Sequence, residues 1–126
     1  MFIDLDQFKY INDTMGHAFG DQLLARVSER LSSLLENNCY IYRLSGDEFI
    51  IIMQDIMNRE EAESFTSRIL KSMRKQFIVS DITINVSLSI GIAFYPDDGN
   101  NIDELLKCAD IAMYKAKEAG RKGYVV

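Results

Sequence analysis

The fold of this chain is decided by the stretch Arg43-Leu44-Ser45-Gly46-Asp47-Glu48-Phe49-Ile50-Ile51-Ile52. A β-branched and aromatic run leads into it, small residues form a turn, two adjacent carboxylates follow, and a second apolar run completes it. This pattern predicts a β-hairpin with strands over 40–44 and 48–53 and acid at its tip, where the backbone is tight enough for a phosphate to approach. Acidic residues at a turn are also ordinary solvated residues, so the hairpin alone leaves both interpretations open.

A second group of carboxylates, in Asp4-Leu5-Asp6, ends an apolar strand predicted over 1–4. Hard oxygen ligands at strand ends are what Mg²⁺ bound to a nucleoside triphosphate requires. In a right-handed β-α-β crossover the first two strands run parallel, and the third fits antiparallel between them. The hairpin turn then lies at the sheet end where the first strand ends, so we expect Asp4 and Asp47 to meet.

The composition is that of one ordinary globular domain. The chain has 126 residues, of which 48% are hydrophobic and 26% charged, and its net charge of −5 argues against a nucleic-acid partner. No apolar run reaches membrane-spanning length and no signal peptide is visible, so we expect a cytoplasmic domain without membrane contact. Cys39 and Cys108 lack zinc spacing and are expected to be reduced thiols that pack as small hydrophobes.

Periodicity and caps predict the other elements, namely helices over 6–35, 58–77 and 101–120 and strands over 82–95 and 124–126. The first helix is expected to break near Gly16 and Gly20, Asn58 to cap the second, and Gly120 to end the third. The order β-α-β-β-α-β predicts a ferredoxin-like α+β sandwich, with helices on one face of a mainly antiparallel sheet.

Six motifs, in this order, resemble the GGDEF domain of diguanylate cyclases: Phe2-Ile-Asp-Leu-Asp-Gln-Phe-Lys-Tyr-Ile-Asn-Asp13, Gly16-His17, Gly20-Asp21, Ser45-Gly-Asp-Glu-Phe49, Ser89-Ile-Gly-Ile-Ala93 and Ala109-Asp110…Tyr114-Lys-Ala-Lys117…Gly120-Arg121. The resemblance covers nearly the whole chain. It implies a fold related to class III nucleotidyl cyclases and polymerase palms. It also implies the condensation of two GTP into cyclic di-GMP and two pyrophosphates, with Mg²⁺, or Mn²⁺ in its place.

The same resemblance implies a metal site. It assigns Asp4, Asp47 and the backbone carbonyl of Leu5 as metal ligands, which leaves room for triphosphate oxygens and water around an octahedral ion. Glu48 would help to deprotonate or orient the attacking 3′-hydroxyl, and a second metal ligand is an equal interpretation of it. Gly46 would let a phosphate approach the backbone closely.

The resemblance also implies that Asn12 and Asp21 recognise guanine. A carboxylate accepts from the guanine N1–H and amino group, whereas adenine would leave it buried and unpaired. Taken alone, the two residues favour the interpretation as a turn residue and a helix cap. Phe8 and His17 would stand beside this pocket, Phe8 as a core ring and His17 as a brace of the helix entry rather than a catalyst.

Cations near the end of the last helix are assigned to the triphosphate. Lys117 and Arg121 are four residues apart, so on a continuous helix they share a face. A solvated basic face, or cations that complement the helix dipole, are the competing interpretations. Lys9 is a further phosphate candidate.

The chain departs from the family pattern at three places. Ser45 replaces the first glycine of the signature, and we expect an active or weakened site rather than a dead one. Glu36 stands where many members carry the arginine of an Arg-x-x-Asp product site, so feedback inhibition there should be absent. No usual N-terminal helix precedes the first strand, and the sheet face it shields should be exposed or filled by a partner chain.

The sequence therefore predicts a single diguanylate cyclase domain over 1–126 that acts as a dimer, at least transiently, with one GTP on each subunit. The residues of its motifs most resemble those of the GGDEF half of GGDEF–EAL tandem proteins, so a fused sensor or EAL domain is expected. The alternative is a non-catalytic GTP-binding module that regulates a fused phosphodiesterase or a partner. A third interpretation, an interaction domain without nucleotide, requires the acidic and basic clusters to be coincidental.

Overall fold

A mixed five-stranded sheet forms the centre of the computed structural model, which describes residues 1–121 and 123–126. Its strands lie in the order β2 (Cys39–Ser45), β3 (Glu48–Met53), β1 (Phe2–Leu5), β6 (Leu88–Gly91) and β7 (Tyr124–Val125). All neighbours are antiparallel except β6 and β7. Because β3 is antiparallel to both β1 and β2, these two strands run parallel, as the predicted crossover requires.

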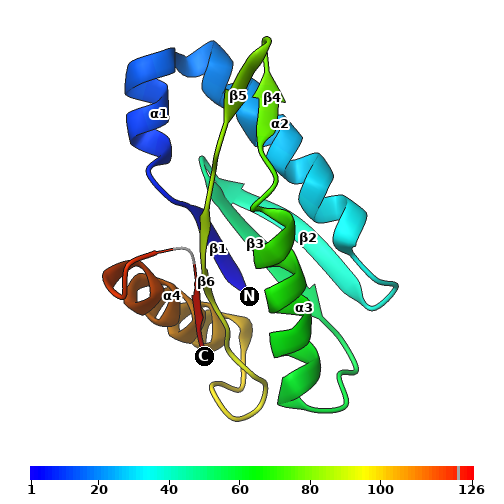
Figure 1. Cartoon of the computed structure of the whole chain (residues 1–126). Coiled ribbons are helices and arrows are strands. Elements are labelled where there is room, and N and C mark those ends of the chain that lie inside the picture. The colour runs from blue at the N-terminus through cyan, green and yellow to red at the C-terminus, as the bar shows by residue number, and fades with distance from the viewer. Residues whose placement is uncertain (122) are drawn as a thin grey trace.

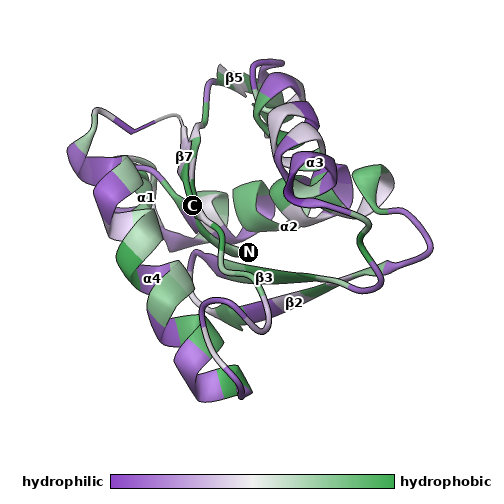
Figure 2. Ribbon diagram, turned by 90° about the horizontal axis from the view of Figure 1, so that it is seen from below, coloured by the Kyte–Doolittle hydropathy of each residue, from purple (hydrophilic) through white to green (hydrophobic). Residues whose placement is uncertain are grey.

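In the described part of the chain, four helices and a small hairpin accompany the sheet (Figure 1). The elements are α1 (Phe8–Met15), α2 (His17–Leu34), α3 (Arg59–Ser72), β4 (Phe77–Val79), β5 (Ile82–Ile84) and α4 (Ile102–Glu118). The predicted α+β class is confirmed, and the side-chain bonds of the expected Asn58 cap and of Asn101 are both formed. Figure 2 shows hydrophilic and hydrophobic bands alternating along α3 and α4, as expected for helices that pack on one side only.

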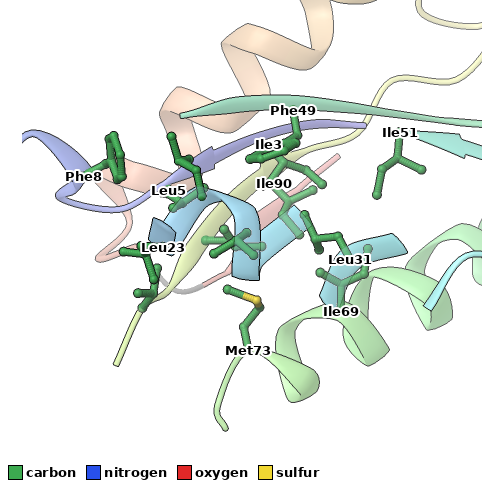
Figure 3. Packing of buried hydrophobic residues seen from close by; sticks show 14 of the residues in the cluster. Ile3, Leu5, Phe8, Leu23, Leu31, Phe49, Ile51, Ile69, Met73 and Ile90 are labelled. Atoms are coloured by element: carbon green, nitrogen blue, oxygen red, sulfur yellow. The ribbon is translucent and has the colours of Figure 1, made fainter. Parts of the chain in front are cut away.

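The main core lies between one sheet face and helices α2 and α3 (Figure 3). Alternate strand residues such as Ile3 and Phe49 pack there against the predicted stripes of the two helices, which include Leu23, Leu31 and Ile69. Each of these side chains is at most 1% exposed. Full burial of such a residue stabilises the fold by roughly 1.5–3 kcal/mol, so this layer holds the sheet in place.

Helix α4 covers the other sheet face, which corrects the prediction that the helices share one face. Phe2 alternates with Ile3 along β1 and packs in a separate cluster with Ala109 and Met113 of α4. The physical reason is that successive residues of a strand point to opposite faces, and both faces of β1 are apolar.

The long first helix breaks once, at Gly16, and not at Gly20 as well. Gly16 has a φ of 90°, whereas Gly20 lies inside α2. A Cβ on Gly20 would come within 1.8 Å of Asn12 Oδ1, so this glycine permits close packing of α1 against α2. The sequence pattern could not separate a glycine that ends a helix from one that permits a contact.

The predictions of a helix over 58–77 and a strand over 82–95 are too long. Helix α3 ends at Ser72, and the guanidinium of Arg30 binds the carbonyls of Ser72, Lys75 and Gln76 at 3.2, 2.6 and 3.1 Å. The chain then forms the β4–β5 hairpin, whose turn residues Ser80 and Asp81 have φ of 47° and 64°. The Asn-Gly or Asp-Gly pair that usually marks such a turn is missing, so the hairpin was not predicted.

One apolar surface is left uncovered on the α4 side of the sheet. Tyr40, Tyr42 and Leu44 of β2 and Ile52 of β3 are 45%, 55%, 51% and 37% exposed. Tyr40 and Ile52 are register partners, so the four side chains form a continuous surface, here called the β2–β3 face.

Two smaller expectations concern thiols and membranes. Cys39 is buried as predicted, but Cys108 is exposed on α4, where its Sγ lies 3.2 Å from the carbonyl oxygen of Asp98. Cys108 stands among the apolar residues of α4 in the sequence, but its side chain lies outside the helix face that the sheet covers. Within residues 1–121 and 123–126, no helix combines the length and apolar character needed to cross a membrane.

Candidate functional site

The end of β1 and the bend of the β2–β3 hairpin lie side by side. The backbone N–H of Leu5 donates to the carbonyl oxygen of Asp47 at 3.2 Å, and Asp4 is the register partner of Glu48. The expectation that Asp4 and Asp47 meet at one sheet end is therefore confirmed. A parallel pair of strands with an antiparallel strand between them brings these distant acids together.

Asp4 carries an incompletely satisfied carboxylate. Its Oδ1 is buried without a hydrogen-bond partner among the described residues, while Oδ2 lies 3.2 Å from Nζ of Lys117. Burial, followed by the hydrogen bond and charge of Asp47, raises the pKa of Asp4 to about 7, and Lys117 offsets part of this rise. A buried oxygen of this kind beside a second acid is chemically suited to a divalent cation.

Glu48, the third acid of the expected ligand set, is not joined with Asp4 and Asp47 in a metal site within the described chain. Burial, then the charges of Asp47 and Asp110, raises the pKa of Glu48. In the part of the chain that the structure describes, no group of three or more His, Cys, Asp or Glu side chains is arranged to hold a metal ion. The expected trio of Asp4, Asp47 and Glu48 is therefore not assembled as a metal site among the described residues. Asp4 and Asp47 are the two acids that the structure brings together at this sheet end.

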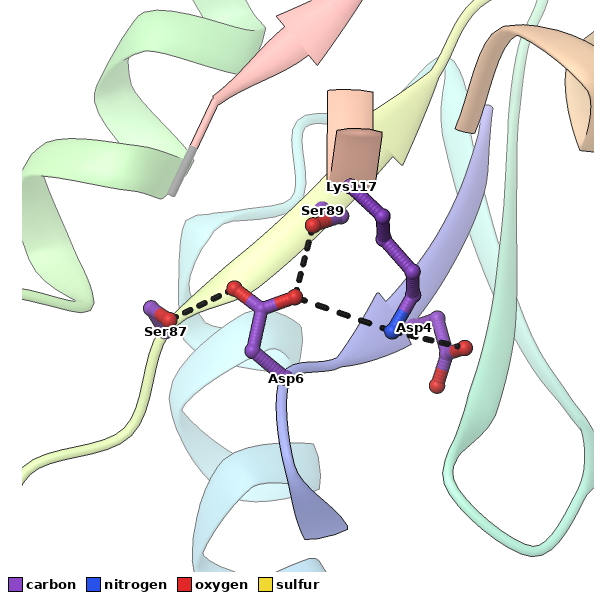
Figure 4. A network of polar contacts seen from close by, with 5 residues as sticks. All are labelled: Asp4, Asp6, Ser87, Ser89 and Lys117. Carbon is purple, nitrogen blue, oxygen red and sulfur yellow. Dashed lines mark hydrogen bonds and ion pairs between the residues drawn. The ribbon is translucent and has the colours of Figure 1, made fainter. Parts of the chain in front are cut away.

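Lys117 reaches this acidic end of the sheet from the last turn of α4. Its Nζ lies 3.2 Å from Asp4 Oδ2 and 3.7 Å from Asp6 Oδ1, and Figure 4 shows the ammonium between the two carboxylates. Asp6 in turn accepts from the hydroxyls of Ser87 and Ser89. Sequence reasoning assigned no separate role to Asp6. The signal for it was a pair of serines, Ser87 and Ser89, at alternate positions of the strand predicted over 82–95.

Arg121 does not share a helix face with Lys117, which corrects the spacing argument. Helix α4 ends at Glu118, and Arg121 follows Gly120, whose φ is 105°. The backbone N–H of Arg121 donates to the carbonyl of Ala116 at 3.1 Å, and its side chain is exposed. A glycine in the left-handed region ends the helix, so the spacing of four no longer describes one turn.

Helices α1 and α2 bring Asn12 next to Gly20, the residue before Asp21. Asn12 Oδ1 is buried without a hydrogen-bond partner in the described part of the chain, and Asp21 is exposed. Both residues lie inside helices, so the interpretations as turn residue and helix cap are wrong. Phe8 is a buried core ring at 8% exposure, as expected.

The remaining candidates lie on the surface. His17 begins α2 and is exposed, and among the described residues no side-chain hydrogen bond caps this helix end. Lys9 is exposed on α1. Ser45 is exposed at the end of β2, beside an irregularity in the strand register, and Gly46 has a φ of 45° that suits glycine. These positions leave the hairpin bend open to solvent.

Two other features lie away from the acids. A cavity of about 580 Å³ is found where β1 begins and where β3 and β6 end, with Met53 and Phe94 in its lining, so it is at the opposite sheet end. Glu36, at the place of the product-site arginine, pairs with Arg68 at 2.5 Å. Neither feature adds a group to the acidic end of the sheet.

Comparison with known proteins gives one consistent family. The family model described as "Diguanylate cyclase, GGDEF domain" matches residues 1–123. The signaling protein YkoW of Bacillus subtilis is 48% identical over 98% of this chain and 16% of its own length. The cyclic di-GMP phosphodiesterase NbdA of Pseudomonas aeruginosa is 40% identical over 96% of this chain and 15% of its own length.

A third relative, the diguanylate cyclase TpbB of P. aeruginosa, is 39% identical over 96% of this chain and 28% of its length. The solved GGDEF domain of TpbB matches with a TM-score of 0.94 at 38% identity, over 98% of this chain and 73% of that one. An EAL/GGDEF domain protein from M. capsulatus matches with a TM-score of 0.93 at 36% identity, over 98% and 80%. This chain thus spans less than a third of these curated relatives, and it belongs to the GGDEF domain family.

Proposed function

We propose that this chain is a Mg²⁺-dependent diguanylate cyclase domain that condenses two GTP into cyclic di-GMP and two pyrophosphates. The observation that supports it is the junction of Asp4 with the Asp47 bend, where a buried carboxylate oxygen lacks a partner among the described residues. Membership of the GGDEF domain family and the presence of both acids also support the proposal.

The proposed metal ligands are Asp4, Asp47 and the Leu5 carbonyl, and Mn²⁺ would fit the same oxygen donors. When bound, the ion would neutralise triphosphate charge as the α-phosphate is attacked. Glu48 is the proposed acceptor of the 3′-hydroxyl proton. Its pKa is raised, which makes the carboxylate a stronger base than a solvated glutamate.

The nucleotide would lie between the acidic sheet end and the α1–α2 pair. Asn12 and Asp21 would recognise guanine, beside Phe8 and His17. This assignment is supported by the packing of Asn12 against Gly20, the residue before Asp21. The proposed phosphate groups are Lys117, Arg121 and Lys9, together with the hairpin bend at Ser45 and Gly46. A guanidinium offers a bidentate fork to phosphate and an ammonium a point charge.

The reaction requires two subunits. In the proposed dimer each 3′-oxygen attacks the α-phosphate of the GTP on the other subunit, a P–O bond forms, and pyrophosphate leaves. Orientation and charge neutralisation would supply most of the rate. We further propose that the domain works in the cytoplasm, fused to a sensor or EAL domain, since this chain matches only part of each relative above.

The direct test is incubation of the protein with GTP and Mg²⁺, followed by chromatography for cyclic di-GMP. Asp47→Ala should abolish product and weaken Mg²⁺-dependent GTP binding, since one of two anionic donors is lost. Asp103→Ala, an exposed acid on α4, is the matched control and should retain product. Unchanged Mg²⁺-dependent binding in Asp47→Ala would contradict the proposed metal role.

A second candidate, a regulatory module that binds GTP without turnover, is favoured by two observations. Ser45 replaces a glycine at the hairpin bend, and the relative NbdA is named as a phosphodiesterase. Protection of the chain by GTP against thermal unfolding, without any cyclic di-GMP, would support the module. In that case Ser45→Gly should create or increase cyclase activity if the serine is the cause.

A further inference from the structure

Asp6 is a buried carboxylate that the proposed reaction does not use. The residue follows β1 and is 6% exposed. The Ser87 hydroxyl donates to its Oδ2 and the Ser89 hydroxyl to its Oδ1, both at 2.6 Å (Figure 4). The backbone N–H of Asp6 also donates to the Ser87 carbonyl at 2.9 Å. These bonds hold the carboxylate against β6 and the residues just before it.

The charge of Asp6 faces Lys117. The distance from Nζ to Asp6 Oδ1 is 3.7 Å, and the Lys117 side chain is 20% exposed. A buried carboxylate is costly unless it is hydrogen-bonded and paired with a cation. A lysine has a flexible four-carbon stem, so its ammonium keeps one position only where a fixed partner holds it. Asp6 is such a partner, because two hydroxyls fix its own orientation.

The two acids around Lys117 are not equivalent. Both oxygens of Asp6 accept a serine hydroxyl, whereas Asp4 Oδ1 has no hydrogen-bond partner among the described residues. A cation that approaches this site would therefore compete with Lys117 for Asp4 and not for Asp6. Lys117 would lose one of its two acidic partners and keep the other.

We propose that Asp6 is a positioning residue, held by Ser87 and Ser89, that keeps the Lys117 ammonium directed at the triphosphate after Asp4 has turned to another cation. The inference rests on the proposed function, because it takes Lys117 as a phosphate ligand. Asp6 touches no reacting atom in this scheme and acts only through Lys117. Ser89 of β6 and Ser87 just before it thus act on the site indirectly, through Asp6 and Lys117.

A double-mutant cycle tests this dependence on Lys117. Asp6→Asn, Lys117→Met and the double variant are titrated by calorimetry with Mg²⁺ and 3′-deoxy-GTP, which lacks the attacking hydroxyl and cannot be condensed. Asp6→Asn alone should weaken binding about tenfold, and by less than about twofold in the Lys117→Met background. Equal losses in both backgrounds would show a merely structural role and overturn the proposal.

Matched variants keep the test independent of folding. Glu118→Gln removes an exposed charge next to Lys117 and should leave binding within about twofold. Ser87→Ala removes one hydroxyl from Asp6 and should weaken binding through Lys117, whereas Ser87→Thr keeps the hydroxyl and should restore it. If Asp6→Asn fails to fold, Ser87→Ala replaces it in the double-mutant cycle with Lys117→Met, and Ser87→Thr is the control. Equal losses of binding from Ser87→Ala in both backgrounds would then overturn the proposal.

A measurement without metal or nucleotide gives a second readout. The ¹⁵N–¹H signal of the Lys117 ammonium should be observable by NMR in the original chain and lost to fast solvent exchange in Asp6→Asn. It should persist in Glu118→Gln. A signal unchanged by Asp6→Asn would mean that Asp6 does not hold the ammonium, which overturns the proposal.

The outcomes separate this inference from the proposed function. Coupling of Asp6 to Lys117 without cyclic di-GMP from GTP supports the positioning role and contradicts the condensation. Cyclic di-GMP without coupling contradicts the positioning role alone. If the chain binds no 3′-deoxy-GTP, both the positioning role and the proposed function are overturned, because Lys117 then binds no triphosphate.

Discussion

At the scale of single residues, the site is set by the environment of one carboxylate. Asp4 stands in a strand that is apolar on both sides, so its charge is desolvated, and the hairpin bend adds Asp47 beside it. Lys117 supplies partial compensation from α4. This combination leaves an acid that binds a proton or a cation more readily than a surface aspartate does.

The raised pKa of Asp4, about 7 against an ordinary 3.8, predicts a pH dependence of stability without divalent ions. The folded state favours the protonated acid, so its contribution is complete below pH 3.8 and is lost as pH rises through 7. Asp4→Asn, which is neutral at every pH, should therefore gain stability relative to the original chain by up to ~1.4 kcal/mol per pH unit in this window.

Urea unfolding at pH 5 and pH 8, in the presence of a chelator, measures this difference. Asp103→Asn is the matched control and should follow the original chain at both pH values. Parallel pH profiles of the unfolding free energy for Asp4→Asn and the original chain would show that folding does not raise the pKa of Asp4.

At the scale of elements, the site depends on the close approach of α4 to β6. A Cβ on Gly91 would come within 1.9 Å of the carbonyl oxygen of Ala109 and 2.3 Å of the backbone nitrogen of Met113. Backbone atoms of a helix cannot move aside as a side chain can. The position of Lys117, on the same helix, therefore depends on a glycine in the neighbouring strand.

Gly91→Ala should force α4 away from the sheet and lower the free energy of unfolding by about 3 kcal/mol or more. The displacement should also separate Lys117 from Asp4 and Asp6. Thermal or urea unfolding measures the loss, and Gly123→Ala is the control, since its nearest atom would be 3.8 Å away. Equal stability of the two variants would mean that α4 is not seated as the structure has it.

At the scale of the whole molecule, one surface has no cover within the described residues. The β2–β3 face joins two tyrosines to Leu44 and Ile52, next to the sheet half that α4 protects. Apolar surface of this extent on an isolated domain promotes association. Its chemistry differs from that of the acidic sheet end, so the two regions can be tested separately.

Charges placed on the β2–β3 face should therefore reduce self-association of this chain. Sedimentation of Tyr42→Lys/Leu44→Lys without nucleotide should show less concentration-dependent association than the original chain, with thermal stability nearly unchanged. Met57→Lys, at an exposed residue outside this face, is the control. Association that persists in the double variant would exclude the β2–β3 face as its cause.

Local sequence patterns determined the element types, the Asn58 cap, the helix stop at Gly120 and the acidic hairpin, because periodicity and turn chemistry act over a few residues. Chain order alone also predicted that Asp4 and Asp47 meet, since crossover handedness leaves few topologies. Tertiary structure decided what depends on distant contacts. Arg30 ends α3 early, Gly91 seats α4 on the second sheet face, Gly20 packs against Asn12, and Asp6 pairs with two serines more than eighty residues away. No local pattern encodes such pairings, because each arises only when folding brings separate segments within hydrogen-bonding or van der Waals distance.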